Sequence, residues 1–459
     1  MRSEATDPRS PDRGEGQADG PRLDIRFDLE VVRGWLRMVD SGEPDGEEIR
    51  AWVELPGNRE LLRLGRRHGT LSPERLERAA LAAIRGEEDD PPAPLGRLEV
   101  GPWNALAGLA GRIGEEGPGL AVRVGRAVSP FLPGDREYAP IDVYFHLGGQ
   151  WDGRTRGAVY INLTIFQSRG ADSLPGLDAL LVHEVFHQAQ ASVLPGVEDY
   201  SSAQSTLFTA LLRIQQEGMA RYVEHSHLEM AGAGAPIDVT HLDKYRDGLR
   251  HAADSAALLE YLLRALDDRD LRRGRLLLDE GLRSGGALYA VGHSMARMID
   301  RRLGRQALLA TVRAGPLAFI DRYLEAAQHA GQPSILPARL AAALDDLRHG
   351  YGASWIEASR QRRRGLLLIR AGRLEDAIAA LRVTAAIDVT DAASAYNLGC
   401  AYALSGRRRP ALRWIERAID RGFDDARLMR TDADFESLRG DVRFERLLLR
   451  LSGASGLDP

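Results

Sequence analysis

The stretch Leu180-Leu-Val-His-Glu-Val-Phe-His-Gln-Ala-Gln190 contains the pattern H-E-x-x-H. On a helix, His183 and His187 leave the same face one turn apart, so their imidazole nitrogens can bind one Zn²⁺. Glu184 can then point at a water beside the metal and take its proton. The alternative is a surface helix that carries two histidines and a solvated glutamate. The apolar residues around the pattern favour a buried active-site helix.

The flanking residues predict where this helix begins and ends. Asp172 or Ser173 can cap its first turn, and Pro175 suits that turn. Pro195 lies just beyond the predicted end. Apolar residues recur every three or four positions, which predicts one buried face. That face consists of Leu177, Leu180, Leu181, Val185 and Ala189.

The composition is that of an ordinary soluble protein with two or three domains. The 459 residues are 44% hydrophobic, and the net charge of −5 gives no reason to expect a nucleic-acid partner. Cys400 is the only cysteine, so an intrachain disulfide cannot form. The first residues lack the apolar core of a secretory signal, and no uncharged apolar run reaches about 18 residues. We therefore expect a cytoplasmic protein without a membrane partner.

Before the motif, the sequence predicts a disordered tail and a helical region. Residues 1–22 are polar and rich in glycine and proline, which predicts disorder. Residues 23–130 are expected to form a helical N-terminal subdomain, with helical periodicity from 23 to 85. In it, Ser72 and Pro73 read as a helix cap and a first-turn proline. After a proline-rich break we expect a helix over 103–113, a glycine-rich loop and a short helix over 119–129.

A catalytic domain is expected over residues 131–350, and its β-structure begins after Pro140. Two β-rich runs, Ile141–Leu147 and Ala158–Ile165, are separated by a loop that includes Gly148–Gly153. We expect these runs to form a hairpin or a small sheet beside the H-E-x-x-H helix. An edge strand there could hold a substrate backbone by strand addition. The alternative is a purely structural sheet that covers the helix.

A second long helical segment over residues 203–225 offers a third metal ligand. A catalytic zinc site takes three protein ligands and keeps one position open. Glu217 follows His187 by 30 residues, which is enough for a loop and a returning helix. Gly218 and Ala220 would let this helix approach the first one closely. Glu217 is therefore the candidate ligand, and the alternative is a solvated glutamate on a helix.

This arrangement resembles the gluzincin, or thermolysin-like, metallopeptidases, in which H-E-x-x-H is followed by a glutamate on a later helix. His183–Gln188 with Glu217–Val223 is especially similar to bacterial zinc-dependent peptidases known only as domains of unknown function. The resemblance covers roughly residues 130–330 and implies an α+β zincin-like domain. It also implies that His183, His187 and Glu217 bind zinc and that Glu184 is the general base.

The chain departs from the thermolysin pattern at one position. Thermolysin-type sequences carry an aspartate four residues after the ligand glutamate, where it orients a histidine. Here that position is Arg221, so another acceptor is needed. The candidates are Glu224, Asp178 and Asn162.

A later segment, Gly285–Asp300, is a predicted helix rich in small residues. Tyr289 and His293 lie four residues apart and share a face. Tyr289-Ala-Val-Gly292 resembles the Y-x-x-G segment of the same peptidases. Either Tyr289 or His293 could donate a hydrogen bond to the oxyanion that develops during peptide hydrolysis. The alternative is that both are core side chains with satisfied polar tips.

Residues 351–450 repeat with a period of 34 residues. The matching pairs are Gly365 and Gly399, Gly372 and Gly406, Ala377 and Ala411, and Leu381 and Ile415. This period is that of tetratricopeptide (TPR) repeats, and it predicts α-helical hairpins followed by a capping segment over 432–444. A protein partner could bind there, and residues 451–459 should be frayed.

The sequence thus predicts a mainly α fold with a small β-sheet, followed by C-terminal α-helical TPR hairpins. The first functional hypothesis is a zinc-dependent peptidase acting on a peptide or protein substrate. The second is a catalytically inactive metallopeptidase-like protein that acts as a TPR binding scaffold. The presence of every ligand and the base argues against a decayed metal site. A structural zinc site is disfavoured because three protein ligands leave one position open.

Overall fold

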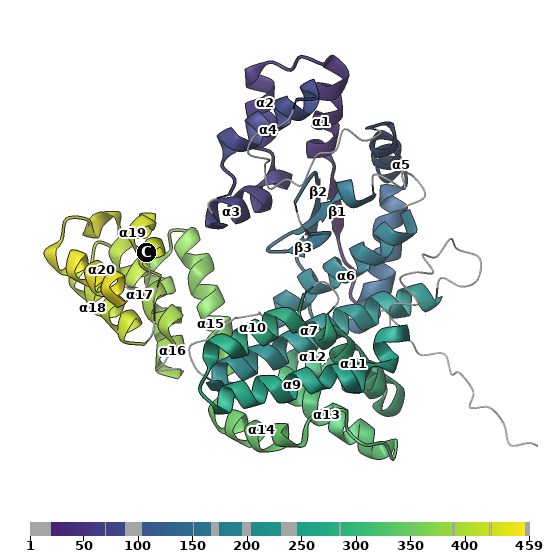
Figure 1. Ribbon diagram of the computed structural model, residues 1–459, viewed down its shortest axis with the longest axis vertical. Helices are drawn as coiled ribbons and strands as arrows, with labels where there is room; N and C mark the ends of the chain where they lie inside the picture. The colour runs from purple at the N-terminus through teal and green to yellow at the C-terminus, as the bar shows by residue number, and fades with distance from the viewer. Residues whose placement is uncertain are drawn as a thin grey trace, which may run out of the picture.

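The computed structural model describes most of the chain, and the described part is mainly helical with one four-stranded sheet (Figure 1). This confirms the predicted mainly α fold with a small sheet. Residues 1–19, Asp172, Ser173 and Pro195 lie outside the described residues, so their predicted roles are untested. The described residues are 20–68, 70–87, 103–149, 151–166, 174–194, 203–230, 246–283, 286–351, 353–387, 391–421, 423 and 425–454.

The N-terminal region opens with a strand, β1 (Ile25–Asp28), and the helical periodicity predicted from residue 23 is wrong there. Ile25 and Phe27 alternate with polar residues, which is the period of a strand. The Phe27 ring packs edge-on against Phe145 with centroids 5.6 Å apart. Ser72 caps the last helix of this region, as predicted, by accepting a hydrogen bond from the Arg75 amide. The helices are α1 (Glu30–Ser41), α2 (Gly46–Val53), η1 (Pro56–Asn58), α3 (Arg59–His68) and α4 (Pro73–Arg85).

Helix α5 (Trp103–Val128) is continuous, so the predicted glycine-rich loop between residues 113 and 119 is wrong. Its buried residues Ile113, Gly117 and Leu120 keep the helical spacing across the expected break. Pro118 lies inside the helix. Packing of this apolar face against the core therefore outweighs the poor helix propensity of the glycines and the proline. The short helix η2 (Ser129–Phe131) follows.

The sheet has the strand order β1-β2-β4-β3. β2 (Ile141–His146) and β4 (Val159–Asn162) are parallel, so the small sheet is confirmed but these two runs do not form a hairpin. The hairpin is made instead by β3 (Gly153–Thr155), which pairs antiparallel with β4. β3 is thereby an edge of the sheet that the described residues form.

The helices after the sheet build the layer that carries the predicted site. Helix η3 (Leu163–Phe166) leads from β4, and α6 (Leu174–Val193) and α7 (Ala203–Met230) pack against each other. The backbones of α7 and α11 touch, since a Cβ at Gly218 would lie 2.2 Å from the carbonyl carbon of Gly292. The other helices of this part are α9 (Ala252–Asp267), α10 (Leu271–Gly281), α11 (Ala287–Leu303), α12 (Arg305–Ala314), α13 (Pro316–His329) and α14 (Ala338–Tyr351).

Two large hydrophobic clusters organise the described residues. One cluster runs from Leu29 to Leu347 and crosses residue 130 without a break. The other runs from Ile378 to Leu451, in helices that lie to one side of the molecule (Figure 1). These helices are α15 (Ala353–Arg370), α16 (Leu374–Ile387), α17 (Ala392–Leu404), α18 (Arg408–Asp420), α19 (Ala426–Thr431), η5 (Ala433–Leu438) and α20 (Val442–Ala454). Among the described helices, none combines the length and the apolar character that crossing a membrane would require.

The two predicted repeats make equivalent contacts. Gly365 faces Leu381 between α15 and α16, and Gly399 faces Ile415 between α17 and α18. At the two helix turns, Gly372 and Gly406 have φ of +70° and +74°, a backbone conformation that glycine adopts without strain. The repeat is thus present in the structure as well as in the sequence. Its assignment to the TPR class stays a prediction.

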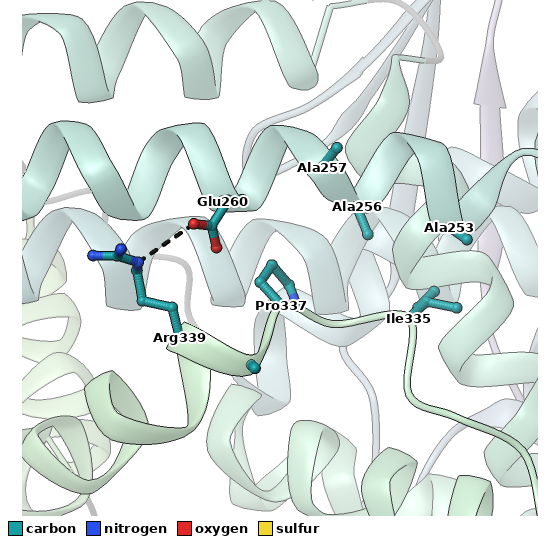
Figure 2. A pocket seen from close by; sticks show the side chains of 8 residues that line it. Ala253, Ala256, Ala257, Glu260, Ile335, Pro337 and Arg339 are labelled. Atoms are coloured by element: carbon teal, nitrogen blue, oxygen red, sulfur yellow. Dashed lines mark ion pairs between the residues drawn. The ribbon is translucent and has the colours of Figure 1, made fainter.

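A surface depression of about 490 Å³ lies between α9 and the start of α14 (Figure 2). Half of its lining residues are alanines, and Ile335 and Pro337 also line it. Its charged groups, Glu260 and Arg339, pair with each other at 3.4 Å. A depression with such a lining offers little acid–base or metal chemistry.

Candidate metal centre

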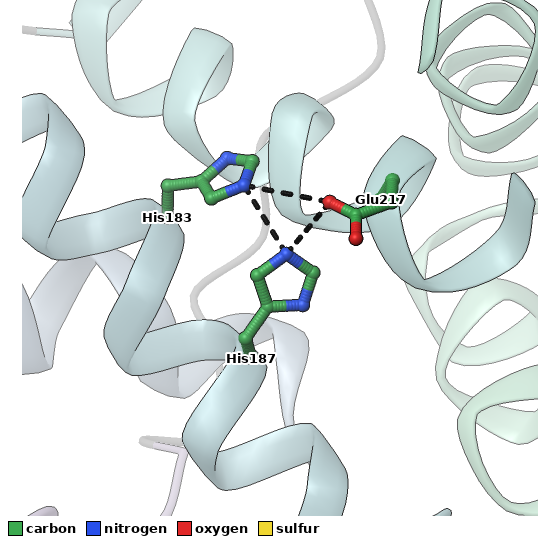
Figure 3. Close-up of side chains that lie close together, drawn as sticks. All are labelled: His183, His187 and Glu217. Atoms are coloured by element: carbon green, nitrogen blue, oxygen red, sulfur yellow. Dashed lines mark hydrogen bonds and ion pairs between the residues drawn. The ribbon is translucent and has the colours of Figure 1, made fainter. Parts of the chain in front are cut away.

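The three predicted ligands converge on one point between α6 and α7 (Figure 3). The Nε2 atoms of His183 and His187 are 3.1 Å apart, and His187 Nε2 lies 3.0 Å from Glu217 Oε2. His183 Nε2 lies 3.7 Å from the same oxygen. Ligand atoms about 2.0–2.2 Å from a tetrahedral zinc are about 3.3 Å from each other. Two imidazoles and a carboxylate at these separations fit Zn²⁺.

The packing of α6 explains why the ligands are held so closely. The predicted face is buried, except that Leu180 is only partly so, and Val182 and Phe186 on other faces are also fully buried. A helix surrounded by apolar neighbours cannot rotate to expose its histidines. His183 is therefore only 9% exposed, and Glu217 on α7 is 5% exposed.

Glu224 is the acceptor that orients a histidine ligand. Its Oε2 lies 3.0 Å from Nδ1 of His183, which leaves Nε2 directed at the other two ligands. Of the other candidates, Asp178 pairs with Arg123 and His227, and Asn162 accepts hydrogen bonds from Thr164. Glu224 stands seven residues after Glu217, two helical turns away on the same side of α7. Of the three candidate acceptors, Glu224 is therefore the one that contacts a predicted histidine ligand.

The charges around the ligands favour a cation. Burial alone would lower the pKa of His183, but hydrogen bonds to Glu217 and Glu224 raise that pKa to about 10. Burial would also raise the pKa of Glu217, but electrostatic interactions with His187 and Arg213 hold that pKa well below its usual range. Glu217 thus stays anionic in a desolvated place, where a divalent cation would compensate its charge.

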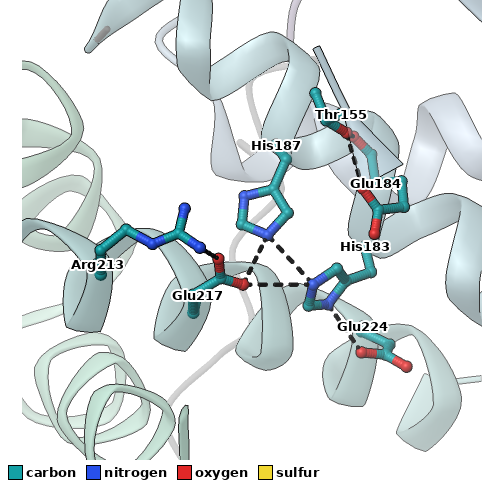
Figure 4. Close-up of polar contacts among 7 residues, drawn as sticks. All are labelled: Thr155, His183, Glu184, His187, Arg213, Glu217 and Glu224. Carbon is teal, nitrogen blue, oxygen red and sulfur yellow. Dashed lines mark hydrogen bonds and ion pairs between the residues drawn. The ribbon is translucent and has the colours of Figure 1, made fainter. Parts of the chain in front are cut away.

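Arg213 is a residue of this site that the sequence analysis missed. Its Nη2 lies 3.0 Å from Oε1 of Glu217, while Oε2 of the same carboxylate faces the histidines (Figure 4). The guanidinium therefore fixes the direction of the ligand carboxylate. Arg213 precedes Glu217 by four residues, and this i,i+4 spacing on a helix was the available signal.

Glu184 is held by the edge strand of the sheet. Thr155 Oγ1 donates a hydrogen bond to Oε2 of Glu184 at 2.7 Å and lies 3.0 Å from its backbone oxygen (Figure 4). A Cβ at Gly153 would lie 2.9 Å from Oε1 of Glu184. The strand therefore touches the carboxylate from one side and leaves it next to His183. Strand register places Thr155 here, and no local sequence pattern indicates it.

Tyr289 and His293 on α11 lie in different surroundings. Burial raises the pKa of Tyr289, and the negative charge of Glu217 raises it further, so the phenol stays protonated and can donate. His293 Nε2 lies 3.1 Å from His225 Nδ1. Burial lowers the pKa of His293 well below its usual range, so its ring is neutral. Glu217 is thus among the groups that act on Tyr289, whose ring lies 5.2 Å from the Arg221 guanidinium carbon, whereas His293 pairs with another histidine.

Comparison with known proteins agrees with this geometry. Residues 105–332 match a family described as "Putative zinc dependent peptidase (DUF5700)". The matched segment contains α6, α7 and α11, and with them all six predicted site residues. No curated protein and no solved structure matches the chain. The family match supports a zinc-dependent peptidase. Which residues bind the metal and which take part in catalysis is inferred from the geometry of the site.

Proposed function

We propose that this chain is a zinc-dependent peptidase of the gluzincin type, with His183, His187 and Glu217 as zinc ligands. The observation that carries this proposal is the convergence of two Nε2 atoms and one carboxylate oxygen within 3.7 Å of one another. Glu184 stands beside the first ligand, where a general base is required. The fourth metal position is available for water or substrate.

The catalytic roles follow from the positions of these side chains. A zinc ion held here supplies Lewis acidity, which acidifies water and polarises the scissile carbonyl. Glu184 takes the proton of the attacking water and later passes it to the leaving amine. Thr155 holds one oxygen of that carboxylate, so the base is already oriented when the substrate arrives.

The oxyanion and the substrate backbone also need partners. Tyr289 is favoured over His293 as the oxyanion donor, because its protonated hydroxyl faces Glu217 whereas His293 lies against His225. β3 is an edge strand in contact with Glu184, so it can pair with an extended substrate. Strand addition would align the scissile bond with the base.

The C-terminal helix pairs would serve a second task. Their 34-residue period and equivalent glycine contacts support TPR hairpins, which commonly bind protein segments. We propose that they contact a protein partner or the substrate. A single, buried cysteine is compatible with work in the reducing cytoplasm.

The test compares the wild type with Glu184→Gln. Both proteins should carry zinc, because Glu184 is not a ligand. A broad synthetic peptide mixture analysed by mass spectrometry should show cleavage by the wild type and a loss of about 1,000-fold or more in the variant. If the zinc-loaded wild type cleaves nothing, the inactive TPR scaffold is the better account.

A further inference from the structure

The edge strand β3 presents two different surfaces. Gly153 and Thr155 face Glu184, as their contacts with its carboxylate show. Side chains alternate along a strand, so Arg154 points to the opposite side. There its Nε atom lies 3.0 Å from Glu60 on α3. A peptide paired with β3 would therefore turn every second side chain away from the metal and towards α3.

Four arginines gather on that side and are called here the arginine cluster: Arg63 of α3, Arg154, Arg156 and Arg370 of α15. Glu60 is buried and already pairs with Arg63 at 2.6 Å and with Arg154 at 3.0 Å. Arg156 and Arg370 are exposed, and neither has a carboxylate within ion-pair distance among the described residues. The cluster therefore keeps an excess of positive charge.

Arg156 lies near charged residues of α3, β3 and α15. Partial burial lowers the pKa of Arg156, and the nearby charges of Arg63, Arg154 and Arg370 lower it further, against the opposing charge of Glu60. The arginines thus come from the N-terminal region, the sheet edge and the C-terminal helices together.

Helix α15 is fixed beside the catalytic helix. Arg363 of α15 donates a hydrogen bond to the backbone oxygen of Ala191 in the last turn of α6. A cation is favoured at that end of a helix. Composition adds to the charge, since α3 contains four arginines and one glutamate, and α15 contains five arginines and one glutamate.

We propose that the arginine cluster selects acidic peptides: a substrate strand paired with β3 places alternate glutamate or aspartate side chains against Arg156 and Arg370. This inference rests on the proposed peptidase function and names its substrate class. Opposite charges across neighbouring strands contribute modestly at exposed positions, and two such pairs correspond to about a five-fold preference. The preference is electrostatic, so it weakens as salt is added.

The test measures binding without turnover, in the full-length Glu184→Gln protein loaded with zinc. Two fluorescein-labelled peptides serve as probes, one with alternating alanine and glutamate and one with alternating alanine and glutamine. The Glu184→Gln protein is compared with a form that also carries Arg156→Gln and Arg370→Gln. The matched control carries Arg302→Gln and Arg409→Gln instead, two exposed arginines, one from each part of the molecule.

The expected result is that the glutamate peptide binds at least about five-fold more tightly than the glutamine peptide in about 50 mM salt. The preference should disappear in the Arg156 and Arg370 form and persist in the control. Equal affinities, a preference unchanged by these substitutions, or no binding up to about 1 mM glutamate peptide would overturn the inference. Displacement of the peptide by an equal concentration of a single-stranded oligonucleotide would overturn it too, because the cluster would then be a general polyanion site.

Cleavage by the wild type distinguishes this inference about the substrate class from the proposed peptidase function. If the wild type cleaves peptides without acidic preference, only the substrate class is wrong. If the zinc-loaded wild type cleaves nothing, the peptidase proposal fails, and the substrate inference fails with it.

Discussion

The α7–α11 contact and the α17–α18 contact both depend on a glycine. The glycine faces a helix backbone in the first contact and a side chain in the second. At Gly218, an added Cβ would meet the backbone of Gly292 at 2.2 Å. At Gly399, it would meet the Ile415 side chain at 2.8 Å, and the nearest backbone atom lies 3.6 Å away. A side chain can move aside, whereas two helix backbones cannot do so without separating the helices.

The α7–α11 contact therefore tolerates less movement than the α17–α18 contact. Helix α7 buries polar residues around the metal site, and α17 buries mainly alanine, leucine and tyrosine. Buried carboxylates and histidines function only at fixed distances from one another. The helices packed against α7 must therefore hold it in one position. The α17–α18 contact at Gly399 is made with an apolar side chain instead.

Gly218→Ala should destabilise the catalytic layer by about 3 kcal/mol or more, because α11 must move away from α7. Gly399→Ala should be close to neutral, since Ile415 can shift and alanine favours the helix by about 1 kcal/mol. Urea unfolding followed by circular dichroism measures both. Equal losses in the two variants would contradict the proposed difference between the contacts.

Glu224→Ala should weaken zinc binding by about 10- to 100-fold, because His183 loses the acceptor that orients its ring. Glu224→Gln serves as the control, since its amide oxygen can still accept from Nδ1 and should restore part of the affinity. Competition with a chromophoric zinc chelator measures the change. If Glu224→Ala binds zinc as tightly as the wild type, the orienting role is wrong.

Arg213→Met should weaken zinc binding by about ten-fold, because Oε1 of Glu217 loses a charged partner and the carboxylate can rotate. Methionine keeps most of the side-chain volume, and Arg213→Lys should retain part of the effect. The same chelator assay applies. An unchanged zinc affinity in Arg213→Met would show that α7 alone positions Glu217.

Thr155→Val should leave the zinc content unchanged and reduce kcat/KM by roughly five- to ten-fold, which corresponds to one hydrogen bond of about 1 to 1.4 kcal/mol. Valine has nearly the same shape, so packing is preserved. Zinc analysis and peptide hydrolysis together separate this change from the two above. Loss of zinc in Thr155→Val would mean that β3 supports the metal site itself.

The parts of the site that local spacing encodes could be predicted from the sequence. H-E-x-x-H lies on one helical turn, and Glu217 lies beside Gly218, which allows close helix packing. Glu224 could be named as a candidate but not ranked, because its approach to His183 depends on how α7 is rotated against α6. That rotation is set by the α11 backbone at Gly292, about 70 residues further along the chain.

Three features that sequence reasoning missed or misread, β1, Thr155 and the continuous α5, depend on tertiary packing. β1 pairs with β2 across more than 100 residues, and nothing near Ile25 indicates this partner. Thr155 reaches Glu184 only because β3 forms the sheet edge. In α5 the burial of Leu120 and its neighbours outweighs glycine and proline, whose local preference is for a loop. Tertiary packing decided each of these cases.

The zinc content of the purified full-length chain tests the central claim most directly. After dialysis against a weak chelator, the wild type and Glu184→Gln should each retain one zinc ion per chain, as determined by elemental mass spectrometry. His187→Ala and Glu217→Ala should retain about a tenth or less. If these two variants keep as much zinc as the wild type, the three side chains are not the metal ligands and the account is wrong.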